Sequence, residues 1–211
     1  MGTYTAGAGV NYSFNPVEAS GFPILNYDSK AFEGDWFGTF CMERSENFTP
    51  GQTYNVTLSN SATLGGNSTA PDGVPGTSDP LSKGTVYLYD AFARVALAYN
   101  YNSSSAAAEL QNMFWYLEGE ISLSDLGSNS FVSILNTQFG TLDNARLMNT
   151  SPTSVQVMNL TTLAGAPAQS QLVYIPTTSN SVPDGGMTVL LLGISFVGIA
   201  AVRRFAFCPA A

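Results

Sequence analysis

The sequence predicts an α+β fold: a β-rich, sandwich-like or barrel-like domain with an inserted helical pair, followed by a single C-terminal hydrophobic helix. Three observations lead to this prediction. Segments near both ends of the body alternate apolar and polar residues, as half-buried strands do. Two segments between them repeat apolar residues at helical spacing. One uncharged apolar run lies close to the C-terminus.

Strands are predicted before and after the helical region. The segment 35–46, "DWFGTFCMERSE", contains Trp36, Phe37 and other β-favouring residues. Residues 60–83 are rich in Gly, Ser, Pro and Asp, and they predict a long loop. The full set of predicted strand segments is 8–29, 35–46, 52–60, 154–162 and 169–176.

Two helices are predicted between the strands. The first lies within residues 85–100 and is indicated by apolar residues at helical spacing, and the second lies within residues 103–120. Ser104 or Ser105 is expected to cap the second helix, and Gly119 to end it. Residues 128–140 are ambiguous, and a short helix at 130–139 is one possibility. The apolar stripes are Leu88, Phe92, Val95 and Tyr99 in the first helix and Leu110, Met113, Phe114 and Leu117 in the second.

The composition is typical of an exported β-rich protein and unusual for a cytosolic enzyme. Of the 211 residues, 45% are hydrophobic and 12% aromatic, which is enough for one core of ordinary size, but only 10% are charged, against about 25% in soluble proteins. Fifteen acidic and five basic residues precede residue 187, so this body carries a net charge of −10. We expect no nucleic-acid partner, because phosphate binding needs a basic patch.

The chain has no histidine, and its two cysteines are Cys41 and Cys208. The lack of histidine excludes Ser-His-Asp and Cys-His catalysis and most zinc sites. Two cysteines so far apart do not form a CxxC metal or redox pair. We therefore expect no metal, no cofactor and no enzyme. The alternative left open is a hydrolase that uses carboxylates among Glu43, Glu118 and Glu120, since paired carboxylates perform glycoside chemistry.

The C-terminal region combines a short motif, an apolar run and a basic end. The motif is "VPDGG", the run is "TVLLLGISFVGIAAV", residues 188–202, and two arginines follow it at once, as on a cytoplasmic flank. This order resembles the tripartite PEP-CTERM sorting signals, especially their VPDSG variety, with Gly185 in place of Ser. The residues concerned are Val182, Pro183, Asp184, Gly185, Gly186, Arg203 and Arg204.

The resemblance implies that exosortase, a membrane protease-transpeptidase, processes the protein. The chain would be exported, anchored in the inner membrane by a transmembrane helix at 187–202, and then released to the cell surface or extracellular matrix. Exported proteins begin with a signal peptide. The segment "MGTYTAGAGVNYSFNP" lacks that pattern, so we expect a truncated N-terminus. The expected organisation is a domain at 1–175, a linker at 176–181 and a sorting tail at 182–211.

Cys41 has no evident disulfide partner. Three roles remain open: an inert buried thiol, a disulfide to another chain, or a bond to a group other than sulfur. The sequence reads Phe40-Cys41 and, seventy residues later, "LQNMFW" at 110–115. These motifs resemble those of the bacterial thioester domains of surface adhesins.

The resemblance implies an internal thioester between Cys41 and Gln111, shielded from water by Phe40, Phe114 and Trp115. Such a bond would attach the protein covalently to an amine-bearing surface or matrix partner. The alternative function is a non-reactive structural or matrix surface β-protein that exosortase processes.

Overall fold

The computed structural model describes residues 2–7, 12–18, 37–49, 51–63, 79–100 and 103–175. By its internal contacts the chain divides into a compact unit, Met1–Pro176, and a second unit, Thr177–Ala211. The expected linker, sorting tail and transmembrane helix at 187–202 all lie outside the described residues. Within the described residues, none of the helices has the length and apolar character needed to cross a bilayer.

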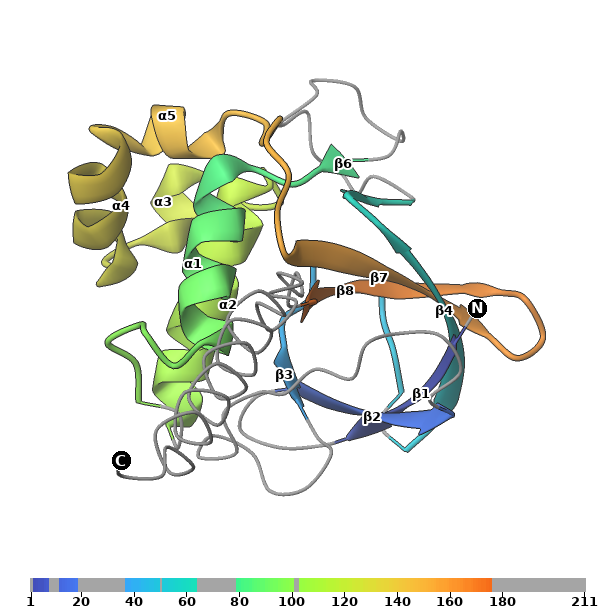
Figure 1. The fold of residues 1–211 in the computed structure, drawn as a ribbon. Coiled ribbons are helices and arrows are strands. Elements are labelled where there is room, and N and C mark those ends of the chain that lie inside the picture. The colour runs from blue at the N-terminus through green and yellow to red at the C-terminus, as the bar shows by residue number, and fades with distance from the viewer. Residues whose placement is uncertain are drawn as a thin grey trace, which may run out of the picture. The chain divides into compact units, whose positions relative to one another are not determined.

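Eight strands occur in the described residues: β1 Gly2–Gly7, β2 Tyr12–Glu18, β3 Phe37–Thr39, β4 Thr53–Ser59, β5 Ser61–Ala62, β6 Asp79–Pro80, β7 Val155–Thr162 and β8 Pro167–Tyr174. Six of them form one antiparallel sheet in the order β3-β2-β1-β4-β7-β8 (Figure 1). The two short strands β5 and β6 pair with each other.

The residues after β3 join the two edges of the large sheet. The Leu172 N–H donates to the Phe40 carbonyl at 3.0 Å, and the Met42 N–H donates to the Ser170 carbonyl at 2.9 Å. These hydrogen bonds pair residues 40–42 with β8, which removes a free strand edge at this point. The sheet therefore closes on itself in a barrel-like way.

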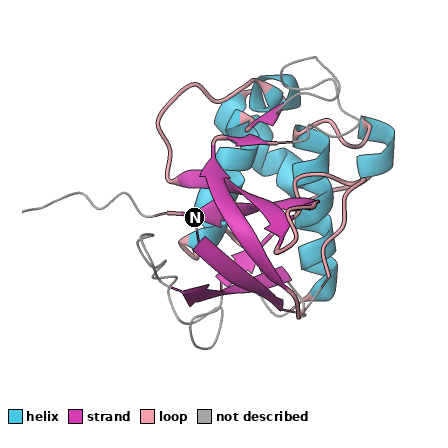
Figure 2. Cartoon of the chain, turned by 90° about the vertical axis from the view of Figure 1, so that its right-hand side faces the viewer, coloured by secondary structure: helices cyan, strands magenta, loops and turns pink. Residues whose placement is uncertain are grey.

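In the described residues between β6 and β7, five helices form an insertion: α1 Lys83–Ala93, α2 Ser104–Leu117, α3 Leu123–Leu126, α4 Phe131–Phe139 and α5 Leu142–Arg146. They gather on one side of the sheet (Figures 1 and 2). The α+β prediction is confirmed, but the insertion contains more than the predicted helical pair.

The sheet separates two hydrophobic clusters because neighbouring residues of a strand face opposite ways. Val157 and Leu172 face the helices and belong to the larger cluster. Met158 and Val173 face the other side and belong to the smaller cluster, together with Val56. The larger cluster contains Leu88 and Phe92 of α1 and all four residues of the predicted stripe of α2. The other two residues of the first predicted stripe, Val95 and Tyr99, lie beyond the end of α1.

Local signals explain where α1 and α2 begin. Ser82 and Ser103 have extended backbones, and their hydroxyls accept hydrogen bonds from the N–H groups of Thr85 and Ala106. The cap of α2 is therefore one residue earlier than expected. Gly84 lets α1 approach α2 closely, since a Cβ there would lie 2.7 Å from the Leu117 Cδ2 atom.

Several boundaries differ from the sequence-based prediction. The expected loop at 60–83 contains β5, β6 and the first residue of α1. The first helix ends at Ala93 and not near Tyr99, and the backbone at Val95 has a φ of 55°, which a helix does not allow. In the segment 35–46 only β3 is a strand, and residues 8–11 and 19–36 lie outside the described part. Within residues 128–140, which the sequence left open, Phe131–Phe139 form α4.

Candidate functional site

Cys41 lies directly opposite Gln171 where the chain after β3 meets β8. The two residues form an isolated antiparallel bridge. The flanking hydrogen bonds run between residues 40 and 172 and between residues 42 and 170. Cys41 and Gln171 are therefore a non-hydrogen-bonded pair, the geometry in which facing side chains lie closest, with Cα atoms about 4.5 Å apart. Their side chains share one face of the sheet.

The Gln171 amide contacts the cysteine sulfur. Its Nε2 donates to Cys41 Sγ at 3.3 Å, and the exposed fractions are 2% for Cys41 and 0% for Gln171. Because an amide C–N bond is about 1.33 Å long, Sγ lies no farther than about 4.6 Å from the Gln171 carbonyl carbon. The Gln171 Oε1 atom is buried and has no hydrogen-bond partner among the described residues.

The environment keeps the Cys41 thiol protonated at neutral pH. Burial raises the pKa of Cys41 to about 12, and the hydrogen bond from Gln171 opposes this shift only in part. A free thiolate is therefore scarce, and any reaction of the sulfur needs an acceptor for its proton close by.

Gln111 also reaches Cys41, but through the main chain. The Cys41 N–H donates to Gln111 Oε1 at 2.8 Å, and Gln111 Nε2 donates to the Cys41 carbonyl at 2.8 Å. These are the two main-chain groups of Cys41 that point away from β8. The side-chain amide of Gln111 thus forms the two hydrogen bonds that a neighbouring strand would otherwise make with Cys41. The sequence-based prediction that Cys41 and Gln111 form a thioester stays a prediction, and the structure brings the two residues together.

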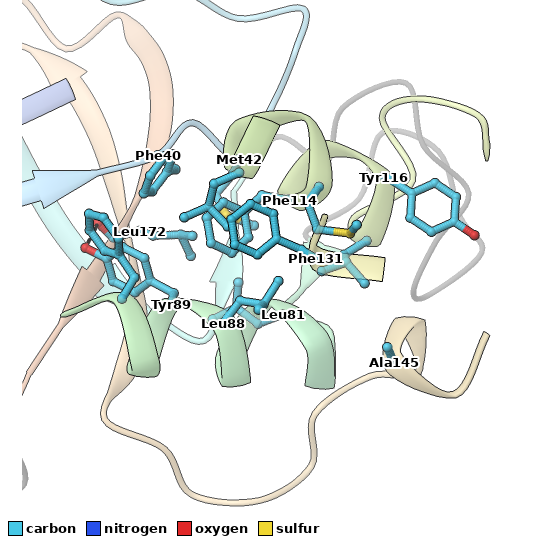
Figure 3. Close-up of a cluster of buried hydrophobic side chains, with 14 of the residues drawn as sticks. Phe40, Met42, Leu81, Leu88, Tyr89, Phe114, Tyr116, Phe131, Ala145 and Leu172 are labelled. Carbon is cyan, nitrogen blue, oxygen red and sulfur yellow. Dashed lines mark hydrogen bonds between the residues drawn. The ribbon is translucent and has the colours of Figure 1, made fainter. Parts of the chain in front are cut away.

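The predicted aromatic shell lies on the other side of the strand from the cysteine sulfur. Phe40 is 1% exposed and Phe114 is buried completely, and their ring centroids are 5.0 Å apart. Figure 3 shows both rings inside the larger cluster, near Met42. Trp115 is partly buried and packs against this cluster. The shell therefore supports the helix that carries Gln111.

The side of Cys41 that carries Sγ faces the smaller cluster. Met158 in β7 is the cross-strand neighbour of Gln171 and is completely buried. Phe37 is four residues before Cys41, so its side chain faces the same side of the sheet, and it belongs to the smaller cluster. The sulfur is thus kept away from water by Phe37, which the sequence offered as a shielding aromatic, and by Met158, which it did not.

Three carboxylates form a second group near the same edge. Oxygens of Glu43, Asp79 and Glu120 lie within 4.8 Å of one another, and these are the described residues that could hold a metal ion. The pKa of Glu120 is raised chiefly by burial. The sequence named Glu43 and Glu120 but missed Asp79, because it lies in the Gly- and Pro-rich segment that predicted a loop.

Glu118 is not part of that group. It accepts a hydrogen bond from the Ser82 N–H at 3.2 Å, at the start of α1. Burial raises its pKa to about 7, and hydrogen bonds from Thr85 and Ser82 and the charge of Arg146 lower it less strongly. Its contacts tie the end of α2 to the beginning of α1.

The sequence-based prediction gave Gln171 no role beyond its place in the predicted strand 169–176. The signal present was a glutamine inside a strand whose other residues are mostly apolar, "SQLVYI". A polar residue at such a position is buried and needs a partner. The partner is 130 positions away in the sequence.

Comparison with known proteins identifies the C-terminal region. Residues 181–204 match the family model described as the VPDSG-CTERM motif. The match includes Val182 to Gly186 and both Arg203 and Arg204, so the predicted sorting signal is confirmed. The motif implies an exported protein that exosortase processes, membrane-associated before processing and surface-exposed afterwards. No curated protein and no solved structure matches the chain.

Proposed function

We propose that this exosortase-sorted surface protein attaches covalently to amine-bearing partners through an internal thioester formed by Cys41 and Gln171. One observation carries the proposal: the buried contact of 3.3 Å between Cys41 Sγ and Gln171 Nε2, held by the pairing of residues 40–42 with β8. A fixed contact of this kind makes the reaction effectively unimolecular.

The chemistry balances without a cofactor. A bond forms between Cys41 Sγ and the Gln171 carbonyl carbon, and the bond from that carbon to Nε2 breaks. The thiol proton leaves with the nitrogen, so the by-product is ammonia. An amine of the partner then attacks the thioester carbonyl, which gives a stable amide on Gln171 and frees the Cys41 thiol.

The two glutamines have different roles, and their hydrogen bonds indicate which role each has. Both polar atoms of the Gln111 amide are engaged by the Cys41 main chain, which holds the strand in place. The Gln171 amide instead faces the sulfur, and its oxygen has no partner among the described residues. Gln111 is therefore a positioning residue, and Gln171 supplies the acyl group.

A count of thiols tests the thioester. The full-length chain, expressed without exosortase, contains two cysteines. A thiol reagent should detect one thiol per chain immediately after unfolding at mildly acidic pH, and two after prior treatment with methylamine. Cys41→Ser is the control and should show one thiol in both cases. Two thiols in the untreated wild-type chain would favour the alternative, a non-reactive surface β-protein.

The sorting signal is tested separately. A reporter fused to residues 181–211 should reach the membrane and be cleaved in a host with exosortase, and it should stay uncleaved in the same host without the enzyme. The matched control is Asp184→Ala, which alters the motif and leaves residues 187–204 intact. Equal cleavage of the two fusions, or of the wild-type fusion in both hosts, would argue against recognition of this motif.

A further inference from the structure

The two side chains of the proposed thioester are closed to solvent. The exposed fractions are 2% for Cys41 and 0% for Gln171. A partner's lysine brings its own chain with it, so its amine cannot reach the Gln171 carbonyl carbon while this arrangement persists. The structure around the two residues must therefore open before a partner is attached, and the ease of that opening sets the rate of attachment.

The edge of β8 that faces Cys41 is held by few main-chain contacts. We call this junction the seam and define it as residues 38–42 and the facing residues 170–172 of β8. In the described part of the chain, two main-chain hydrogen bonds cross it, at residues 40 and 42. Along its other edge, β8 pairs with β7 over its length. Because local opening begins where such contacts are fewest, the site is expected to open at the seam.

Tyr89 of α1 joins the two sides of the seam through its hydroxyl. The hydroxyl donates to the Gly38 carbonyl at 2.8 Å and to the Leu172 carbonyl at 3.2 Å. Gly38 lies in β3 and Leu172 in β8, and Figure 3 shows Tyr89 next to Leu172. A hydroxyl has one hydrogen, so the two carbonyls share it in a three-centre hydrogen bond. The side chain of Tyr89 is completely buried.

The ring of Tyr89 fixes the position of this hydroxyl. It stacks on Phe92, with 5.8 Å between the ring centroids, and it meets Phe40 edge-on at 6.4 Å. Phe40 belongs to the seam and directly precedes Cys41. A side chain packed in this way has already lost its rotamer freedom, so the hydrogen bonds to the two carbonyls cost little further entropy. The helical insertion thereby holds the seam closed.

We propose that Tyr89 is a positioning residue that holds the seam closed, and that opening of the seam admits the amine to the thioester. This inference rests on the proposed function. Tyr89 acts through the main chain of Gly38 and Leu172, on either side of the reacting pair. The loss of one hydrogen bond changes an equilibrium roughly two- to tenfold, and removal of the hydroxyl should increase the open fraction by a factor of this size.

The test measures the rate at which methylamine adds to Tyr89→Phe in the full-length chain. Phenylalanine keeps the ring and its packing and removes only the hydroxyl. Intact-mass spectrometry should show addition about fivefold faster than in the wild type, because the seam is open more often. Tyr54→Phe is the matched control. Its hydroxyl accepts from the Thr49 N–H at 2.6 Å, outside the seam, so this variant also loses a hydrogen bond but should react at the wild-type rate.

A second, larger amine distinguishes opening of the seam from attack on the closed structure. The rates with methylamine and with Nα-acetyllysine amide are each divided by the rate of the same amine with a small model thioester. If the seam opens to admit the amine, the two quotients should agree, and Tyr89→Phe should raise both by the same factor. A purely structural role of Tyr89 would not produce this common factor.

Thr39→Val serves if Tyr89→Phe does not fold. The Thr39 hydroxyl also donates to the Leu172 carbonyl, and its loss should speed the addition in the same way. Wild-type rates in the folded variants, or exclusion of the larger amine, would overturn this inference and leave the thioester standing, since the wild-type chain would still weigh about 17 Da less than its sequence. A wild-type chain without that mass difference would refute the proposed function, and this inference with it.

Discussion

Methylamine is expected to add once to the wild-type chain and not at all to Cys41→Ala or Gln171→Glu. The wild-type chain should first weigh about 17 Da less than its sequence, because thioester formation expels ammonia. Addition of methylamine should then raise that mass by about 31 Da and free one thiol. Intact-mass spectrometry of the full-length chain measures both steps.

Matched Gln→Glu variants separate the two glutamines. Glutamate keeps the size of glutamine but has no amide nitrogen to lose, so Gln171→Glu should abolish the adduct. Gln111→Glu should retain an adduct, at a lower yield, because one of the two hydrogen bonds to the Cys41 main chain is lost. The reverse pattern would assign the acyl group to Gln111, as the sequence-based prediction has it.

Phe114→Ala is expected to cause the largest loss of stability among these substitutions. Phe114 is completely buried in the larger cluster, with its ring centroid 5.0 Å from that of Phe40 and 6.2 Å from that of Tyr89. Truncation of such a ring removes buried surface and leaves a cavity, at a cost of about 3–5 kcal/mol. Urea unfolding followed by fluorescence measures the change in the free energy of unfolding.

Leu163→Ala is the matched control for this prediction. Leu163 lies between β7 and β8 and is 67% exposed, so its truncation should change stability by no more than about 0.5 kcal/mol. Because Phe114 and Gln111 share α2, the destabilised variant should also form less of the methylamine adduct. A cost below about 1 kcal/mol for Phe114→Ala would show that the ring does not hold this helix in place.

The helices α1 and α2 could be predicted from the sequence because their signals are local, whereas the short helices α3 and α5 were not predicted. Leu110, Met113 and Leu117 recur within two turns, and all three are buried as that spacing predicts. Two short motifs also predicted that Cys41 and Gln111 lie close together. By contrast, the end of α1 coincides with a positive φ at Val95. No local pattern in the sequence predicts that backbone conformation.

The contact between Cys41 and Gln171 could not be predicted from the sequence, for a physical reason. The two residues are 130 positions apart, and they meet only because the chain after β3 pairs with the far edge of the sheet. Strand alternation says which residues share a face, but it does not say which strands become neighbours. The sorting signal was readable because its motif is a short linear sequence.

The most direct test of the central claim is to locate the amine by tandem mass spectrometry. The wild-type chain is treated with methylamine and digested, and the peptides that contain Gln111 and Gln171 are sequenced. We expect a methylamide on Gln171 and an unmodified Gln111. A methylamide on Gln111, or two unmodified glutamines in a chain of full sequence mass, would contradict it.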